Sequence, residues 1–384
     1  MLYKVGSKDD PRNKTGMAHL FEHMMFTGSK NAPDFDLVLQ MASGENNAFT
    51  NADITNYYET LPCPNVDTAL WLESDRMQYL SLDASSFSTQ QSVVMEEFKE
   101  TCLNPPYGMV WHRLMDMTYT THSYKWPTIG IDLDHIANIT LQDLHRFYDQ
   151  YYRTDNAVLV LGGGIDHQVA LEKASKWFGE CSASSSVLQR KETPEPEQHE
   201  YRYQSMEVDS SMDMIYIAFP MMDRLDSHYY HADLLSDVLG NGKSSMLYQP
   251  LVLNQQLFIS VDAFITGATE NGLFIIEGKL AKGVDHDVAF DAIWKVIERV
   301  KTDVISESEM KKVYHQTISA MAFANVSLLN KVMNLAYFEA LGNADLINEE
   351  AEIYGMITNE DILEMGRKLL QKHRCSRLDV KAQL

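Results

Sequence analysis

The chain has 384 residues, enough for two domains, and its 45% hydrophobic and 22% charged residues are typical of a folded globular protein, which excludes disordered and fibrous classes. Acidic residues (54) outnumber basic ones (32) and give a net charge of −22. This negative field repels phosphate backbones, which argues against nucleic acid as a partner, and it attracts cations and basic peptides.

In the first part of the chain, residues 14–26 place apolar side chains at helical spacing, and Gly28 follows where a helix C-terminal glycine is common. This pattern predicts a buried helix. Residues 46–59 mix β-branched and aromatic side chains with small polar ones, which predicts two strands joined by a turn. A second helix is predicted over residues 88–102, ended by the Asn-Pro-Pro that follows.

Further along, residues 157–166 (AVLVLGGGID) predict a buried strand that runs into a glycine turn, and residues 167–178 predict an amphipathic helix. Residues 182–198 are small, charged and proline-bearing, which is typical of a surface linker. After it the pattern starts again. The next predicted elements are a strand at 214–220, a helix at 228–242, and strands within 257–266 and 272–280.

Two halves with a similar order of elements predict an α+β fold of two similar tandem domains, residues 1–182 and 199–384, joined by a linker at 183–198. No run of about 18 apolar residues predicts a membrane-spanning helix. The four cysteines lie far apart without a CxxC pair, which argues against a thiolate zinc site or a dense disulfide framework.

The most informative segment is AHLFEHMMFTG, which contains His19, Glu22 and His23. Positions i and i+4 share one face of a helix, so the two imidazoles can reach one metal ion with the glutamate beside them. Zinc in a hydrolytic site takes three protein ligands and keeps one position open for water. The H-x-x-E-H order (HxxEH) is the inverted form of H-E-x-x-H, in which the glutamate is the general base.

The alternative to a metal site is a hydrogen-bonded cluster of core side chains, since a chain with 13 histidines can match a five-residue pattern by chance. However, the two histidines and the glutamate lie in an otherwise apolar helix. Polar groups left unpaired there would be costly, so something must satisfy them. The context therefore favours a metal.

Other segments accompany this motif: NNAFTNADITNYY, VVMEEF, HSYKWPTIG and YYRTDNAVLVLGGGID. With YKVGSKDDPRNKTGMAHLFEHMMFTGS, they make the chain resemble the M16 peptidases, the inverted-zincin (inverzincin) family of pitrilysin, insulin-degrading enzyme and the mitochondrial processing peptidases. The length resembles the shorter bacterial and mitochondrial branch. The resemblance implies two LuxS/metallopeptidase-like domains, each a mostly antiparallel sheet packed with helices, the second lacking the zinc motif. Together they would form half of a clamshell.

The resemblance also implies a third zinc ligand, a glutamate on a separate helix. Glu97 matches the family's pattern in VVMEEF, and Glu96 is expected to face elsewhere. Glu100 is the alternative, because it shares the helical face of Glu97. Taken by itself, an acidic run such as EEFKE would be interpreted as a solvated helix surface.

Residues Asn47, Ala48, Phe49 and Thr50 resemble the family's edge strand, which pairs with the substrate backbone. Main-chain hydrogen bonds of this kind bind any extended peptide, and side-chain pockets add selectivity. Without the resemblance, an ordinary structural strand would be the simpler interpretation.

Two departures from the family's pattern stand out. Gln90 occupies a position, seven residues before Glu97, where the family usually has another glutamate, so a supporting carboxylate is absent. Val252 and Ile259 occupy the positions where active single-chain members carry an Arg and a Tyr that reach the substrate carbonyl. The resemblance then implies a paired arrangement in which a partner chain brings the Arg/Tyr pair.

The expected function is that of a zinc-dependent endopeptidase subunit that cleaves extended peptides, possibly basic ones, in a closed chamber, with Glu22 activating a zinc-bound water. His19, His23 and Glu97 would hold the Zn²⁺, and the chain would form a homo- or heterodimer with an M16-like subunit. The alternatives are a non-catalytic core-type assembly subunit and a peptide-binding scaffold. The expected setting is bacterial and without a membrane span: periplasmic if a removed N-terminus carried a signal sequence, otherwise cytoplasmic.

Overall fold

The computed structural model describes residues 1–181, 188, 190 and 193–383, so much of the predicted linker lies outside the described residues. Contacts divide the chain into two compact units, each made of three segments. Unit 1 comprises Met1–Leu103, Trp126–Thr193 and Ala324–Ile347, and unit 2 comprises Asn104–Lys125, Pro194–Phe323 and Asn348–Leu384. The predicted domain boundaries stay a prediction.

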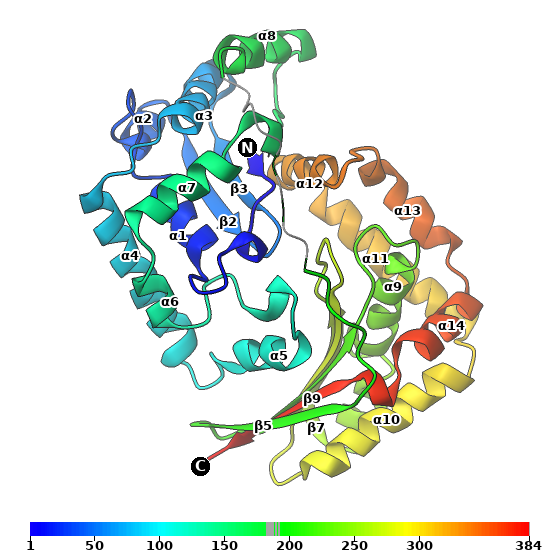
Figure 1. Cartoon of the computed structure of the whole chain (residues 1–384). Helices are drawn as coiled ribbons and strands as arrows, with labels where there is room; N and C mark the ends of the chain where they lie inside the picture. The colour runs from blue at the N-terminus through cyan, green and yellow to red at the C-terminus, as the bar shows by residue number, and fades with distance from the viewer. Residues whose placement is uncertain (182–187, 189, 191–192, 384) are drawn as a thin grey trace. The chain divides into compact units, whose positions relative to one another are not determined.

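Unit 1 contains a four-stranded antiparallel sheet with the strand order β2-β3-β1-β4, of which Figure 1 labels β2 and β3. Its strands are β1 (Leu2–Tyr3), β2 (Glu45–Thr50), β3 (Thr55–Thr60) and β4 (Ala157–Val158). The turn between β2 and β3 is closed by Asn51, whose Oδ1 accepts hydrogen bonds from the backbone of Asp53 and Ile54. The two strands predicted within 46–59 are therefore present, and β2 lies at the edge of the sheet.

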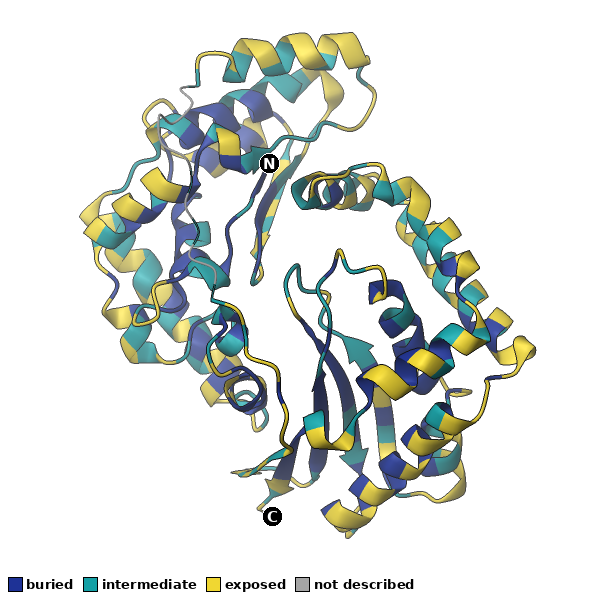
Figure 2. Ribbon diagram, turned by 45° about the vertical axis from the view of Figure 1, so that its right-hand side comes forward, coloured by how far each residue is buried: buried dark blue, intermediate teal, exposed yellow. Residues whose placement is uncertain are grey.

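Unit 1 also contains α-helices. They are α1 (Met17–Met24), α2 (Phe35–Met41), α3 (Val66–Tyr79), α4 (Ala84–Phe98), α6 (Leu133–Ala137), α7 (Leu141–Tyr151), α8 (His167–Phe178) and α12 (Leu328–Leu341). Most show one buried face and one exposed face, as amphipathic helices do (Figure 2).

Helix α1 begins three residues later than the sequence pattern predicted, because Gly16 adopts a left-handed backbone conformation with φ of +90°. A Cβ at Gly16 would lie 2.8 Å from the carbonyl oxygen of Ile129, so only glycine fits there. Asp10 accepts hydrogen bonds from the backbone N–H groups of Gly16 and Ala18 at 2.7 and 2.8 Å. This carboxylate satisfies donors that would otherwise be unpaired at the helix start.

Helix α4 begins four residues earlier than predicted, because the Asp83 side chain accepts hydrogen bonds from the backbone of Ser85 and Ser86 and caps the helix. After Phe98 the chain continues as a π-helical turn, Lys99–Leu103, and the helical conformation ends before Asn104, where the proline-containing stop was predicted.

The strand predicted over 157–166 is much shorter than expected. Only Ala157 and Val158 pair in the described structure, with Tyr3 and Leu2 of β1, and residues 157–161 are half-buried rather than buried. The apolar run predicts a buried strand, but only two of its residues find a strand partner in the described structure. Helix α8 has its predicted bounds, yet none of its residues is fully buried.

Unit 2 contains a five-stranded sheet with the order β5-β9-β6-β8-β7, in which only the β5–β9 pair is parallel. Its strands are β5 (Arg202–Val208), β6 (Met214–Pro220), β7 (Phe258–Ile265), β8 (Leu273–Leu280) and β9 (Ser376–Ala382), and its helices are α5 (Val110–Thr118), α9 (Tyr229–Gly240), α10 (His286–Thr302), α11 (Glu307–Ala324), α13 (Leu346–Met356) and α14 (Asn359–Leu369). The elements predicted between 214 and 280 are all present.

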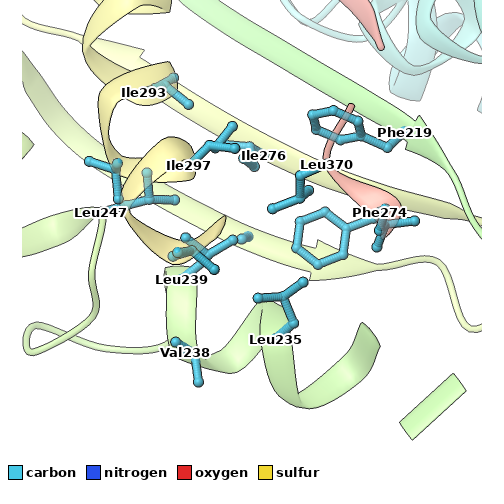
Figure 3. Packing of buried hydrophobic residues seen from close by; sticks show 14 of the residues in the cluster. Phe219, Leu235, Val238, Leu239, Leu247, Phe274, Ile276, Ile293, Ile297 and Leu370 are labelled. Atoms are coloured by element: carbon cyan, nitrogen blue, oxygen red, sulfur yellow. The ribbon is translucent and has the colours of Figure 1, made fainter. Parts of the chain in front are cut away.

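One large apolar cluster holds unit 2 together. Phe219 of β6 and Phe274 of β8 point to the same side of the sheet and meet Leu235 of α9 and Ile297 of α10 (Figure 3). Burying each such side chain contributes about 1.5–3 kcal/mol relative to leaving it exposed. The predicted α+β class, with mostly antiparallel sheets packed with helices, is thus confirmed. No helix in the described ranges is long and apolar enough to cross a bilayer.

Candidate metal centre

Two helices of unit 1 bring the predicted ligands together. Helix α1 packs against α4 (Figure 1), and His19 and His23, one turn apart on α1, face Glu97 of α4. Nε2 of His19 lies 3.7 Å from Glu97 Oε1, and Nε2 of His23 lies 3.6 Å from Glu97 Oε2. The potential ligand atoms all lie within 4.8 Å of one another, and no other such group of His, Cys, Asp or Glu exists among the described residues.

The alternatives to Glu97 lie away from this cluster. Glu96 is 65% exposed and forms an ion pair with Lys99 at 2.6 Å, and Glu100 is exposed. Glu97 is more shielded, at 38% exposed. The geometry therefore brings Glu97, of the three glutamates considered, to the two histidines.

The ionisation of these side chains suits a cation. Burial lowers the pKa of His19 to about 4, so its imidazole is neutral at physiological pH. A hydrogen bond with His23, with further help from the charges of both histidines, lowers the pKa of Glu97 in spite of its burial. Burial alone would lower the pKa of His23, but hydrogen bonding to Glu97 and the charge of that carboxylate outweigh it and raise the pKa.

The donor set fits zinc. Tetrahedral ligands at about 2.0–2.1 Å from zinc lie about 3.3 Å apart, close to the separations between Glu97 and the two Nε2 atoms. Two imidazoles and one carboxylate would leave a fourth position for water, which is the arrangement of hydrolytic zinc sites. The planes of the two imidazole rings are at 89° with centroids 4.9 Å apart, and the ligand atoms of His19, His23 and Glu97 lie within 4.8 Å of one another.

Glu22 lies beside the cluster on the same helix. It is half-buried, and Oε2 accepts a hydrogen bond from the Thr50 hydroxyl. Burial raises the pKa of Glu22, and the hydrogen bond from Thr50 acts in the opposite direction. A carboxylate with a raised pKa, held by one neutral donor, has the properties of a general base and acid.

The other predicted substrate-binding residues follow along β2. Among the described strands, β2 pairs only with β3, so its other edge is open, and α1 packs against the same strand. Asn47 and Phe49 are exposed, and Ala48 is half-buried. Thr50 differs from them, because its hydroxyl contacts Glu22 rather than the open edge.

Gln90 is a site residue whose contact the sequence did not reveal. It was singled out only as a missing carboxylate, yet its Oε1 lies 3.3 Å from Nδ1 of His23. It precedes Glu97 by seven residues, which is two helical turns, and this spacing places both side chains on one face of α4. That spacing is the signal by which the contact could have been found.

The second pair of unusual positions lies in unit 2. Val252 is partly buried against the large apolar cluster, and Ile259 is 47% exposed on β7, an edge strand of its sheet. Neither side chain can donate a hydrogen bond.

Comparison with known proteins agrees with this architecture. Residues 1–131 match the sequence model described as "Insulinase (Peptidase family M16)", and residues 138–317 match "Peptidase M16 inactive domain". The zinc protease PqqE of Helicobacter pylori is 30% identical over 320 residues, which cover 81% of this chain and 71% of that protein. The mitochondrial-processing peptidase subunit beta of Saccharomyces cerevisiae is 24% identical over 384 residues, covering 96% and 82%.

Solved structures share the fold. A protease from Helicobacter pylori superposes with a TM-score of 0.93 at 24% identity, covering 99% of this chain and 93% of that one. An M16 inactive domain from Pseudomonas fluorescens gives a TM-score of 0.87 at 18% identity, covering 100% and 92%.

Proposed function

The chain belongs to the M16 peptidase family, and on this premise we propose that it is the zinc-binding subunit of an endopeptidase. The observation that carries the proposal is the convergence of His19, His23 and Glu97 beside Glu22. Relatives named zinc proteases support the same reaction class.

His19, His23 and Glu97 would hold the zinc. When bound, zinc supplies Lewis-acid polarisation of the scissile carbonyl and lowers the pKa of water at its open position. Glu22 accepts the proton of the attacking water and passes it to the leaving amine. Thr50 keeps the Glu22 carboxylate in place through its hydroxyl.

The substrate proposed is an extended peptide. The open edge of β2 supports strand addition, in which Asn47, Ala48 and Phe49 would lie along the substrate backbone. The net charge of −22 favours basic peptides, and salt should weaken that preference because it screens exposed charges. Equal cleavage of acidic and basic peptides at low salt would contradict this part of the proposal.

We further propose that the active species is a dimer with an M16-like subunit, closed around a chamber. Val252 and Ile259 provide no donor where active single-chain members carry an Arg and a Tyr. A partner that carries this pair would supply the missing stabilisation of the developing oxyanion.

Two rival functions share the fold: a non-catalytic assembly subunit and a scaffold that binds peptides without cutting them. Both would have no need of a general base beside three converging ligands. The intact set of His19, Glu22, His23 and Glu97 therefore favours the enzyme.

The test measures cleavage of a quenched fluorescent peptide by the zinc-loaded chain, with and without its candidate partner. The cleavage rate of the wild type is compared with the rates of two variants. Glu22→Gln should keep its zinc and lose cleavage, because it removes only the proton acceptor. Glu96→Gln, an exposed change on the helix that carries Glu97, should behave like the wild type. Undiminished cleavage by Glu22→Gln, or no cleavage by the wild type under any of these conditions, would refute the proposal.

A further inference from the structure

The two histidines of the metal centre differ in the hydrogen-bond partner of Nδ1, the ring nitrogen that does not face Glu97. Nδ1 of His23 faces Oε1 of Gln90 at 3.3 Å. Nδ1 of His19 is buried and has no hydrogen-bond partner among the described residues. Both rings direct Nε2 toward Glu97. One imidazole is therefore oriented by a neighbouring side chain, and the other only by its packing.

We propose that Gln90 is a positioning residue that prepares His23 to bind the metal, an inference that rests on the zinc site of the proposed function. A neutral imidazole carries one proton, on either nitrogen. When Oε1 of Gln90 accepts the proton of Nδ1, the lone pair stays on Nε2, the atom that faces Glu97. Metal-binding histidines commonly donate their other N–H to an oxygen in this way, which fixes both tautomer and ring orientation.

Gln90 and Glu97 act from the same rigid element. Both belong to α4. Gln91, the residue after Gln90, anchors this helix by donating hydrogen bonds to the carbonyls of Ile136 and Ile139 at 2.9 and 3.1 Å. Helix α4 therefore supplies one ligand of the metal and the group that orients another. The third ligand, His19, has no such support.

An amide orients His23 less firmly than a carboxylate would. If the Gln90 side chain turns by 180°, its NH₂ group faces the ring and donates to Nδ1, which moves the ring proton to Nε2 and blocks metal binding there. A carboxylate has no donor and permits only the productive arrangement. It would also add a negative charge near the cation. Gln90→Glu should therefore tighten zinc binding, whereas Gln90→Met, of similar shape but with only a weakly accepting sulfur, should weaken it.

The test measures the zinc dissociation constant by competition with a chromophoric chelator, without reference to turnover. Loss of an orienting partner commonly costs about 10–100-fold in metal affinity, and this loss is expected for Gln90→Met. Gln90→Glu should bind at least about tenfold more tightly than the wild type. The matched control is Gln91→Met, which loosens the same helix without touching His23 and should stay within about twofold of the wild type.

A second readout follows the proton on Nδ1 of His23. In the zinc-loaded wild type this proton should exchange slowly with water because Gln90 accepts it, and ¹H–¹⁵N NMR should show faster exchange in Gln90→Met. Equal zinc affinities for the wild type, Gln90→Met and Gln90→Glu would overturn the role proposed for Gln90 and would leave the metal centre itself standing. An equal loss in Gln91→Met and Gln90→Met would reduce that role to helix packing. A wild type that binds no zinc would overturn the metal centre and this inference with it.

Discussion

The hydroxyl of Thr50, at the end of β2, donates a hydrogen bond to Oε2 of Glu22 on α1, so the edge strand and the general base of the proposed reaction are directly linked. A hydrogen bond to a charged group contributes about 1.5–3 kcal/mol. Thr50→Val should therefore reduce peptide cleavage about tenfold or more while zinc affinity stays unchanged. Thr50→Ser keeps the hydroxyl and should restore most of the activity. Full cleavage by the valine variant would show that Glu22 needs no such support.

The choice of the third ligand is tested by paired substitutions on one helix. Glu97→Gln should lower zinc affinity by about 100-fold or more, because a neutral amide replaces the only carboxylate of the cluster. Glu100→Gln changes an exposed residue of the same acidic run and should leave zinc affinity as it is. Zinc titrations of the two variants check this, and the opposite pattern would move the ligand to Glu100.

A pH-dependent effect on stability is expected in unit 2, whereas the metal centre belongs to unit 1. Burial raises the pKa of Asp233 from its ordinary 3.8 to about 6. The hydrogen bond that Asp233 accepts from Tyr354 lowers this pKa, and the charge of Asp237 raises it by a smaller amount. The protonated carboxyl stabilises the fold fully below the ordinary pKa, and this contribution is lost as pH rises through about 6.

Asp233→Asn removes this titration but keeps a side-chain oxygen for Tyr354. Between about pH 4.5 and 7.5, the wild type should lose about 2 kcal/mol of unfolding free energy relative to the variant. Urea titrations of both chains at the two pH values provide the measurement. A stability difference that does not change with pH would contradict the assignment.

The dependence on a partner gives a further expectation. Without a donor at Val252 or Ile259, the isolated chain should cleave peptides about 10²–10³-fold more slowly than the pair, the usual cost of losing one preorganised oxyanion donor. Activity should appear on mixing with a homologous subunit that carries the Arg/Tyr pair and should fall again when its Arg is changed to Ala. An isolated chain with full activity would show that its own residues suffice.

Much of the candidate site follows from the sequence because its signals are local. His19 and His23 are one helical turn apart, so their shared face is certain once the segment is helical. Glu97 needed the family resemblance, because nothing in EEFKE distinguishes a ligand from a solvated glutamate. The seven-residue spacing between Gln90 and Glu97 places both on one face of α4, but the contact between Gln90 and His23 joins residues 67 positions apart and depends on the packing of α1 against α4.

Features that depend on tertiary packing were not predictable. Arg76 would be expected on a solvated helix face, yet it is 1% exposed, with its guanidinium 4.5 Å from the centroid of the Phe35 ring, and it pairs with Glu73 at 2.5 Å. The short strand β4 is the opposite case, an apolar segment that is less buried than its sequence predicts. An apolar run predicts burial, but it cannot provide the strand partner that burial in a sheet requires. Helix ends also shifted, since Asp10 and Gly16 set the start of α1 through contacts that periodicity does not encode.

X-ray absorption spectroscopy at the zinc edge, combined with the metal content of the purified chain, tests the metal centre most directly. We expect one zinc per chain, surrounded by nitrogen and oxygen donors at about 2.0–2.1 Å, with the scattering of two imidazole rings and no sulfur. One of the two ring signals should disappear in His23→Ala. A zinc-free chain, a first shell that contains sulfur, or a spectrum unchanged by His23→Ala would contradict the site formed by His19, His23 and Glu97.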